Sequence, residues 1–62
     1  MNTYLKLKDG SIVCLYGENG GRYVVYSLEQ RNTSAQERDY DYICISEVVQ
    51  SDTNIAVLGG KL

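Results

Sequence analysis

The 62-residue sequence predicts a mainly β fold, a small antiparallel sheet of four to five strands. Several short segments alternate apolar and polar residues with the period of two that is typical of half-buried strands. Glycine-containing turn signals separate the early segments, at Asp9-Gly10 and again at residues 17–21. The only aromatic residues are six tyrosines, and tyrosine suits half-buried sheet faces. These observations together favour strands joined by tight turns.

The first strand is expected at residues 3–8, where Leu5 and Leu7 share one face. Asp9-Gly10 then predicts a hairpin with a type I′ turn. The second strand, at residues 11–16, is almost continuously apolar, which indicates that both of its faces are covered. A third strand is expected at residues 22–29, after the glycine-rich turn.

The second half of the chain is less regular. Residues 30–37 are polar without apolar periodicity, which indicates a mobile loop, with a short helical turn at residues 34–38 as the alternative. A fourth strand follows from residue 39 or 40 to residue 46. Residues 47–50 either prolong that strand or form a helical turn. Residues 51–54 are a turn or a helix N-cap, and residues 55–58 are a strand, slightly favoured by their β-branched residues, or a short helix stopped by Gly59. A frayed end is expected at residues 61–62.

Three hairpin-connected strands, a longer loop, a fourth strand and a short closing element suggest an SH3-like barrel. The alternative is an α+β arrangement, a four-stranded meander covered by a short C-terminal helix or by a second subunit. Residues 1–62 are long enough for one domain only. Because so small a core offsets the cost of chain ordering only narrowly, we expect a homo-oligomer, with a dimer favoured.

The sequence also predicts a compartment. The N-terminal residues lack the charged and apolar regions of a signal peptide, and apolar runs of about five or six residues are too short to span a membrane. We therefore expect a cytoplasmic protein. Cys14 and Cys44 lie between aliphatic residues, which predicts two buried, reduced core cysteines, with a disulfide between neighbouring strands as the alternative.

Catalysis is not expected. The sequence contains no histidine, the usual general acid or base near neutral pH, and two separate cysteines fall short of a zinc site. The glycine-rich segment at residues 17–21 lacks the Gly-Lys-Ser/Thr ending of a phosphate-binding loop. We predict neither a catalytic nor a metal site, and no cofactor.

The favoured function is protein–protein interaction. Tyr40 and Tyr42 share a strand face and are predicted to anchor a partner, because tyrosine is enriched at interface hot spots. The alternating carboxylates are predicted to lie along one face and to steer that partner; they are Glu37, Asp39 and Asp41. The chain would be a small regulator, adaptor or inhibitor, such as the inhibitors that mobile elements carry.

The alternative function is single-stranded nucleic-acid binding by an oligomer. Tyr4, Lys6 and Lys8 share a strand face, where a tyrosine could stack a base while the lysines and Arg22 contact phosphates. Two lysines neutralise few phosphates, so one subunit would bind weakly and would lose binding in salt. The net charge of −2 also gives no overall basic surface.

Overall fold

The structure is a computed structural model that describes residues 2–59. Five strands form one sheet; they are β1 (Thr3–Leu7), β2 (Ile12–Asn19), β3 (Arg22–Ser27), β4 (Asp41–Cys44) and β5 (Val48–Asp52). Four short 3₁₀ turns lie between or after these strands; they are η1 (Leu28–Gln30), η2 (Ala35–Glu37), η3 (Ile45–Glu47) and η4 (Ile55–Leu58). The frayed end predicted for residues 61–62 lies outside the described residues.

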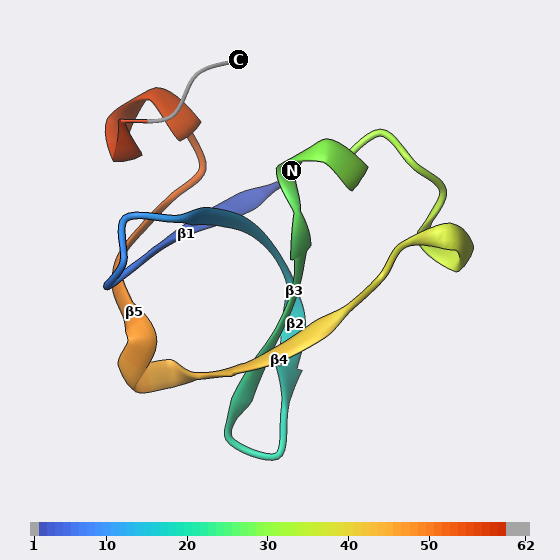
Figure 1. Cartoon of the computed structure of the whole chain (residues 1–62), viewed down its shortest axis with the longest axis horizontal. Helices are drawn as coiled ribbons and strands as arrows, with labels where there is room; N and C mark the ends of the chain where they lie inside the picture. Colours follow the sequence, from blue (N-terminus) through green and yellow to red (C-terminus); the bar gives the residue numbers. More distant parts are fainter. Residues whose placement is uncertain (1, 60–62) are drawn as a thin grey trace.

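The sheet is antiparallel with the strand order β4-β3-β2-β1-β5 (Figure 1). The first four strands form a meander, and η3 turns the chain so that β5 returns beside β1. Within residues 2–59 no pairing joins the two edge strands β4 and β5, so the sheet is open. The predicted mainly β fold is therefore confirmed as a five-stranded antiparallel sheet, which is open within residues 2–59.

The first hairpin forms as predicted, but its turn has another type. Gly10 has a φ of 90°, whereas no described non-glycine residue has a positive φ. A type I′ turn needs positive φ at both central residues, so Asp9 excludes it. The Gly10 amide donates to the Leu7 carbonyl, and the Leu7 amide donates to the Ser11 carbonyl. This pattern is typical of a three-residue loop that ends in a left-handed glycine.

The second hairpin turns at Gly20 and Gly21, with φ values of 62° and 79°. Asn19 pairs with Arg22 across this two-residue loop, so β2 extends beyond the predicted end at residue 16. The register between β2 and β3 shifts between Leu15 and Gly17. A bulge of this kind leaves one residue of the longer strand without a partner, and here that residue is Tyr16.

The end of the chain contains both a strand and a helical turn. β5 occupies residues 48–52, and η4 occupies residues 55–58, where a strand was slightly favoured; that preference is wrong. The Asn54 side chain caps η4 by accepting a hydrogen bond from the Ala56 amide, and Gly59 ends it in the left-handed conformation. These local cap signals outweigh the β-branched residues inside η4.

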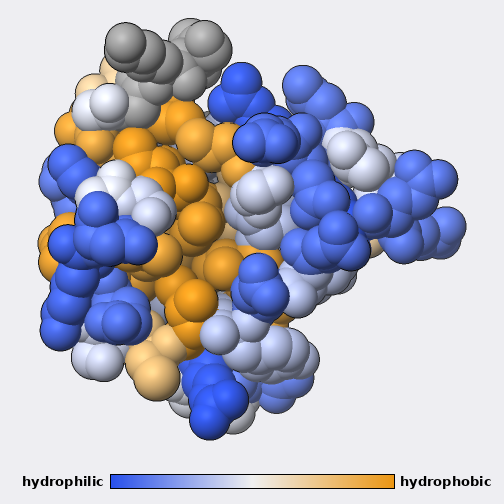
Figure 2. Space-filling model, in the orientation of Figure 1, coloured by the Kyte–Doolittle hydropathy of each residue, from blue (hydrophilic) through white to orange (hydrophobic). Residues whose placement is uncertain are grey.

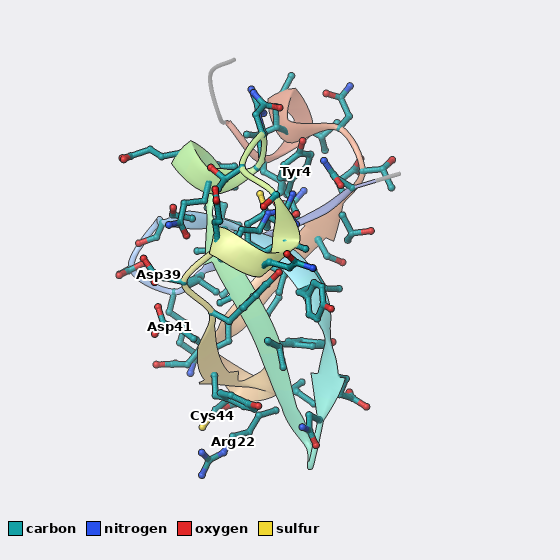
Figure 3. The ribbon with its side chains drawn as sticks, turned by 90° about the vertical axis from the view of Figure 1, so that its right-hand side faces the viewer. Tyr4, Arg22, Asp39, Asp41 and Cys44 are labelled. Atoms are coloured by element: carbon teal, nitrogen blue, oxygen red, sulfur yellow. The ribbon has the colours of Figure 1, made fainter. Side chains whose placement is uncertain are left out.

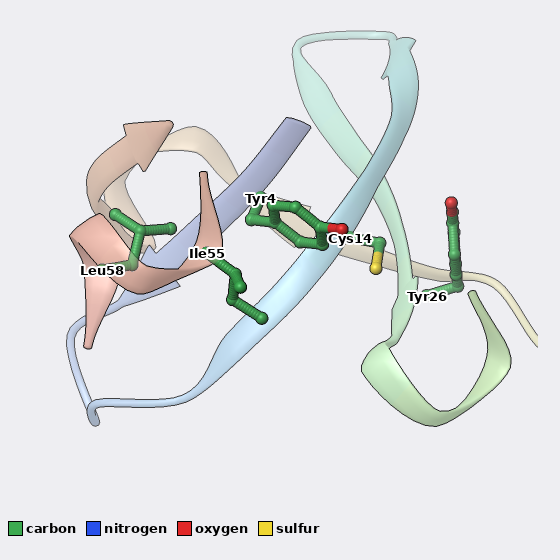
Figure 4. Close-up of a cluster of buried hydrophobic side chains, with 5 residues drawn as sticks. All are labelled: Tyr4, Cys14, Tyr26, Ile55 and Leu58. Carbon is green, nitrogen blue, oxygen red and sulfur yellow. The ribbon is translucent and has the colours of Figure 1, made fainter. Parts of the chain in front are cut away.

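Apolar side chains pack on both faces of the sheet. On one face, Tyr4 pairs with Cys14 and Cys14 with Tyr26, and η4 covers this row with two aliphatic residues (Figure 4). The buried cluster consists of Tyr4, Cys14, Tyr26, Ile55 and Leu58. On the other face, Leu5 and Val25 are buried. The strands β1 to β3 are thus covered on both faces, as the apolar sequence of β2 predicts.

Candidate functional site

The candidate site is built around the edge strand β4. Its register with β3 pairs Tyr42 with Val24 and Asp41 with Val25. Since paired residues point to the same face and neighbours alternate, Asp41 belongs to the face that holds the buried Val25, and Tyr42 belongs to the opposite face. The Tyr42 side chain is 55% exposed. Of the two predicted anchors, Tyr42 is thus open to contact from outside.

Tyr40 has a different environment from Tyr42. Its ring centroid lies 4.6 Å from that of Tyr16 and 5.8 Å from that of Tyr26, with an edge-to-face arrangement in the second pair. Its hydroxyl donates a hydrogen bond of 2.9 Å to the Ala35 carbonyl. Tyr40 is half-buried and packs against the core. Tyr40 therefore acts mainly as a packing residue and projects less into solvent than Tyr42 does.

We call the exposed Tyr16 and Tyr42, together with the half-buried Tyr40, the tyrosine face; Tyr26 packs against Tyr40 but is itself buried. Tyr16 is 60% exposed because the bulge in β2 carries it outward. The apolar sequence of residues 11–16 predicts a strand covered on both faces, so Tyr16 was not expected to be a contact residue. The adjacent Gly17 is the signal for such a bulge, since an isolated glycine in a strand often marks one.

The segment between β3 and β4, expected to be a mobile loop, follows a defined path held by side chains, and η2 forms the helical turn that was the alternative at residues 34–38. Arg38 donates through Nε to the Gln30 carbonyl and through Nη2 to the Arg31 carbonyl, at 3.1 and 2.9 Å. The Gln30 side chain donates to the Asp39 carboxylate and accepts from the Asp39 amide. These hydrogen bonds hold residues 38–39 against residues 30–31, where the segment begins, next to the tyrosine face.

The three predicted carboxylates are exposed but do not form a row along one strand. β4 begins at Asp41, Asp39 precedes it, and Glu37 lies in η2, because the segment turns here instead of extending β4. Asp39 and Asp41 nevertheless lie on the same side of the molecule (Figure 3). The predicted steering charges therefore reduce to the pair Asp39 and Asp41 at the start of the edge strand, while Glu37 lies earlier in the chain, in η2.

The residues of the nucleic-acid alternative are not brought together in one chain. Tyr4 is only 8% exposed and belongs to the buried cluster, so its ring is not free to stack a base. β1 is a central strand that pairs with both β2 and β5. Lys6 is partly buried, and the Lys8 ammonium lies 3.9 Å from the Glu47 carboxylate. Arg22 lies at the opposite end of the molecule from Tyr4 (Figure 3).

The two cysteines also differ. Cys14 is fully buried, as predicted, whereas Cys44 is exposed, and both are free thiols. The expectation that Cys44 is buried is wrong because β4 is an edge strand, and one of its faces remains open despite the aliphatic neighbours. Burial raises the pKa of the Cys14 thiol and that of the Tyr26 phenol.

Several features are absent from the described part of the chain. Residues 2–59 contain no pocket and no group of three or more residues that could hold a metal ion. No helix in this range is long and apolar enough to cross a membrane. No family model, curated protein or solved structure matches the chain. The candidate site therefore rests on its own geometry, that is, on exposed side chains of β2 and β4.

Proposed function

We propose that this chain is a non-enzymatic protein–protein interaction module that contacts its partner through the tyrosine face. The observation that carries the proposal is the exposure of Tyr16 and Tyr42, beside the half-buried Tyr40. Tyrosine contributes a large contact area together with a hydroxyl that bonds to a partner or to water. Because Tyr40 is already held by its hydrogen bond and ring contacts, little side-chain entropy is lost there on binding.

Carboxylates on and just before the edge strand β4, with Asp41 on the sheet face opposite to Tyr42, support a basic partner surface. Glu37, Asp39 and Asp41 are exposed, and none of them forms an ion pair with a residue of the described range 2–59. Charges of this kind at the rim of a contact surface speed association and select partners by sign. A small acidic module that covers a basic surface of another protein would act as a regulator, adaptor or inhibitor.

Oligomerisation is a second part of the proposal. Figure 2 shows a band of hydrophobic residues running between hydrophilic regions of one face. Ile45 and Val49 are exposed, and a chain of this size gains stability by covering such residues in a homo-oligomer. Light scattering during size-exclusion chromatography tests this point, because a mass equal to one chain at all concentrations would contradict it.

The free thiols support a cytoplasmic location, and the meander with β5 beside β1 supports an SH3-like architecture.

Affinity purification from the native host, followed by mass spectrometry, tests the interaction. The tagged chain should retain a partner that both Tyr42→Ala and Tyr16→Ala lose. Val57→Ala is the matched control, since Val57 is similarly exposed but lies on η4, away from the tyrosine face. Equal recovery of the partner by all three folded variants would refute the assignment. Binding of a single-stranded oligonucleotide at low salt, weakened by Lys6→Glu, would instead favour the nucleic-acid alternative.

A further inference from the structure

We infer that the free edge of β4 receives an extended basic segment of the partner protein as an added strand. This inference rests on the proposed function and specifies its partner. β4 pairs with β3 on one side, and within residues 2–59 no strand pairs with its other side. Such an edge presents unpaired backbone N–H and C=O groups, which an extended peptide can satisfy.

Side-chain alternation along β4 sets the chemistry of the added strand. Asp41 and Ile43 point to one face of the sheet and Tyr42 to the other. Asp39 lies on the same side as Asp41 (Figure 3). In an antiparallel partner strand, the first two residues therefore lie opposite Ile43 and Tyr42 and should be apolar. The third and fifth residues lie opposite Asp41 and Asp39 and should be lysine or arginine.

The charges favour a basic partner over a second copy of this chain. Pairing two β4 edges would bring Asp39 and Asp41 of each copy into one short ladder, and like charges across a ladder are destabilising. The other edge strand, β5, carries one carboxylate only, that of Asp52, so it offers a basic segment a single charge instead of a pair at alternate positions.

The test uses the full chain labelled with ¹⁵N and a capped peptide containing Val-Val-Lys-Thr-Lys. Titration should shift the backbone amide signals of β4 and its flanking residues, and the affinity should fall as salt is added. Asp41→Asn should weaken binding about two- to fivefold, and D39N/D41N should weaken it further. Glu18→Gln, which removes another exposed carboxylate, from the β2–β3 hairpin, should leave the affinity unchanged.

Two N-methylated peptides separate strand addition from charge attraction. Methylating the first or the second valine amide leaves the charge unchanged, but only one of these two amides points toward β4. One methylated peptide should therefore lose binding while the other retains it. Equal binding by both, shifts confined to β5, or equal affinity for a scrambled peptide with adjacent lysines would overturn the inference. If the host partner is still lost on Tyr42→Ala in that case, the proposed function stands without strand addition.

Discussion

The guanidinium carbon of Arg38 lies 4.2 Å from the centroid of the Tyr26 ring, which places a cation over a tyrosine of the buried cluster. The same guanidinium donates two hydrogen bonds to the backbone carbonyls of Gln30 and Arg31. Arg38 thus covers the core while it holds the segment that leads into β4. We therefore expect this side chain to help position the edge strand.

Replacing Arg38 with alanine should lower the free energy of unfolding by about 1–3 kcal/mol, because the cation–π contact and both hydrogen bonds are lost. Arg38→Lys keeps the charge but cannot donate in the same planar geometry, so it should recover only part of this loss. Urea denaturation measures both variants. An unfolding midpoint for Arg38→Ala equal to that of the wild type would show that the contact contributes nothing.

Most of the sheet could be predicted from the sequence, because period-two alternation and glycine turns are local signals. β1 and β3 lie within the predicted ranges 3–8 and 22–29. The turn type at Asp9-Gly10 and the bulge before Gly17 could not be predicted in the same way. They depend on how β2 pairs with strands on each side, and the local sequence carries that information only weakly.

The candidate site was predicted less completely, since exposure depends on which strands lie at an edge. Tyr42 and the carboxylates were found because alternating aromatic and acidic residues are visible in the sequence. Tyr16 and Arg38 were missed, because their roles come from contacts with Tyr40 and Tyr26, across the sheet from distant segments. The burial of Tyr4 follows from η4 packing over β1, which no pattern within residues 3–8 indicates.

The first hairpin gives a test of backbone conformation with a matched control. Gly10 has a φ of 90°, a conformation that residues with a side chain rarely adopt, whereas the φ of Gly17 is not positive. An added Cβ at either position would meet no atom within 4 Å. Gly10→Ala should therefore destabilise the fold by about 1 kcal/mol through backbone strain alone. Gly17→Ala should be close to neutral. Thermal unfolding of both variants checks the difference, and equal effects would argue against a left-handed residue at position 10.

The two thiols should react at very different rates in the native protein. Cys44 is exposed on the edge strand and should be labelled rapidly by an aromatic disulfide reagent such as Ellman's reagent. Cys14 is fully buried and should react only when the chain unfolds. The native wild type should therefore show one fast thiol, and Cys44→Ser should show none. Two fast thiols in the native protein would contradict the burial of Cys14.

Tyr40 should reveal a structural role that differs from that of Tyr42. Tyr40→Phe removes the hydrogen bond to the Ala35 carbonyl and should cost about 0.5–1.5 kcal/mol. Tyr40→Ala also removes both ring contacts and should cost more, about 3 kcal/mol. Tyr42→Ala should stay within about 0.5 kcal/mol of the wild type, since that side chain is largely exposed. Chemical denaturation compares the three, and equal losses for Tyr42→Ala and Tyr40→Ala would refute this division of roles.

Stability should fall at alkaline pH because burial raises two pKa values in the native state. The pKa of Cys14 lies above the ordinary 9.0 and that of Tyr26 above the ordinary 10.0, and loss of hydration is the main cause in both cases. The native state therefore keeps these protons after the unfolded chain has released them. A proton retained only by the native state means that ionisation favours unfolding.

Each protonated group stabilises the native state fully when the pH is below its ordinary pKa, the value in the unfolded chain. This stabilisation is lost as the pH rises from the ordinary pKa to the higher native pKa. The decline should begin near pH 9 with Cys14 and should continue above pH 10 with Tyr26. Cys14→Ala should lower stability at every pH by leaving a cavity, but it should flatten the first part of the decline. Urea midpoints measured from neutral pH upward test this, with Cys44→Ser as the control for an exposed thiol. An identical pH slope in Cys14→Ala and the wild type would show that the pKa of the buried thiol is not raised.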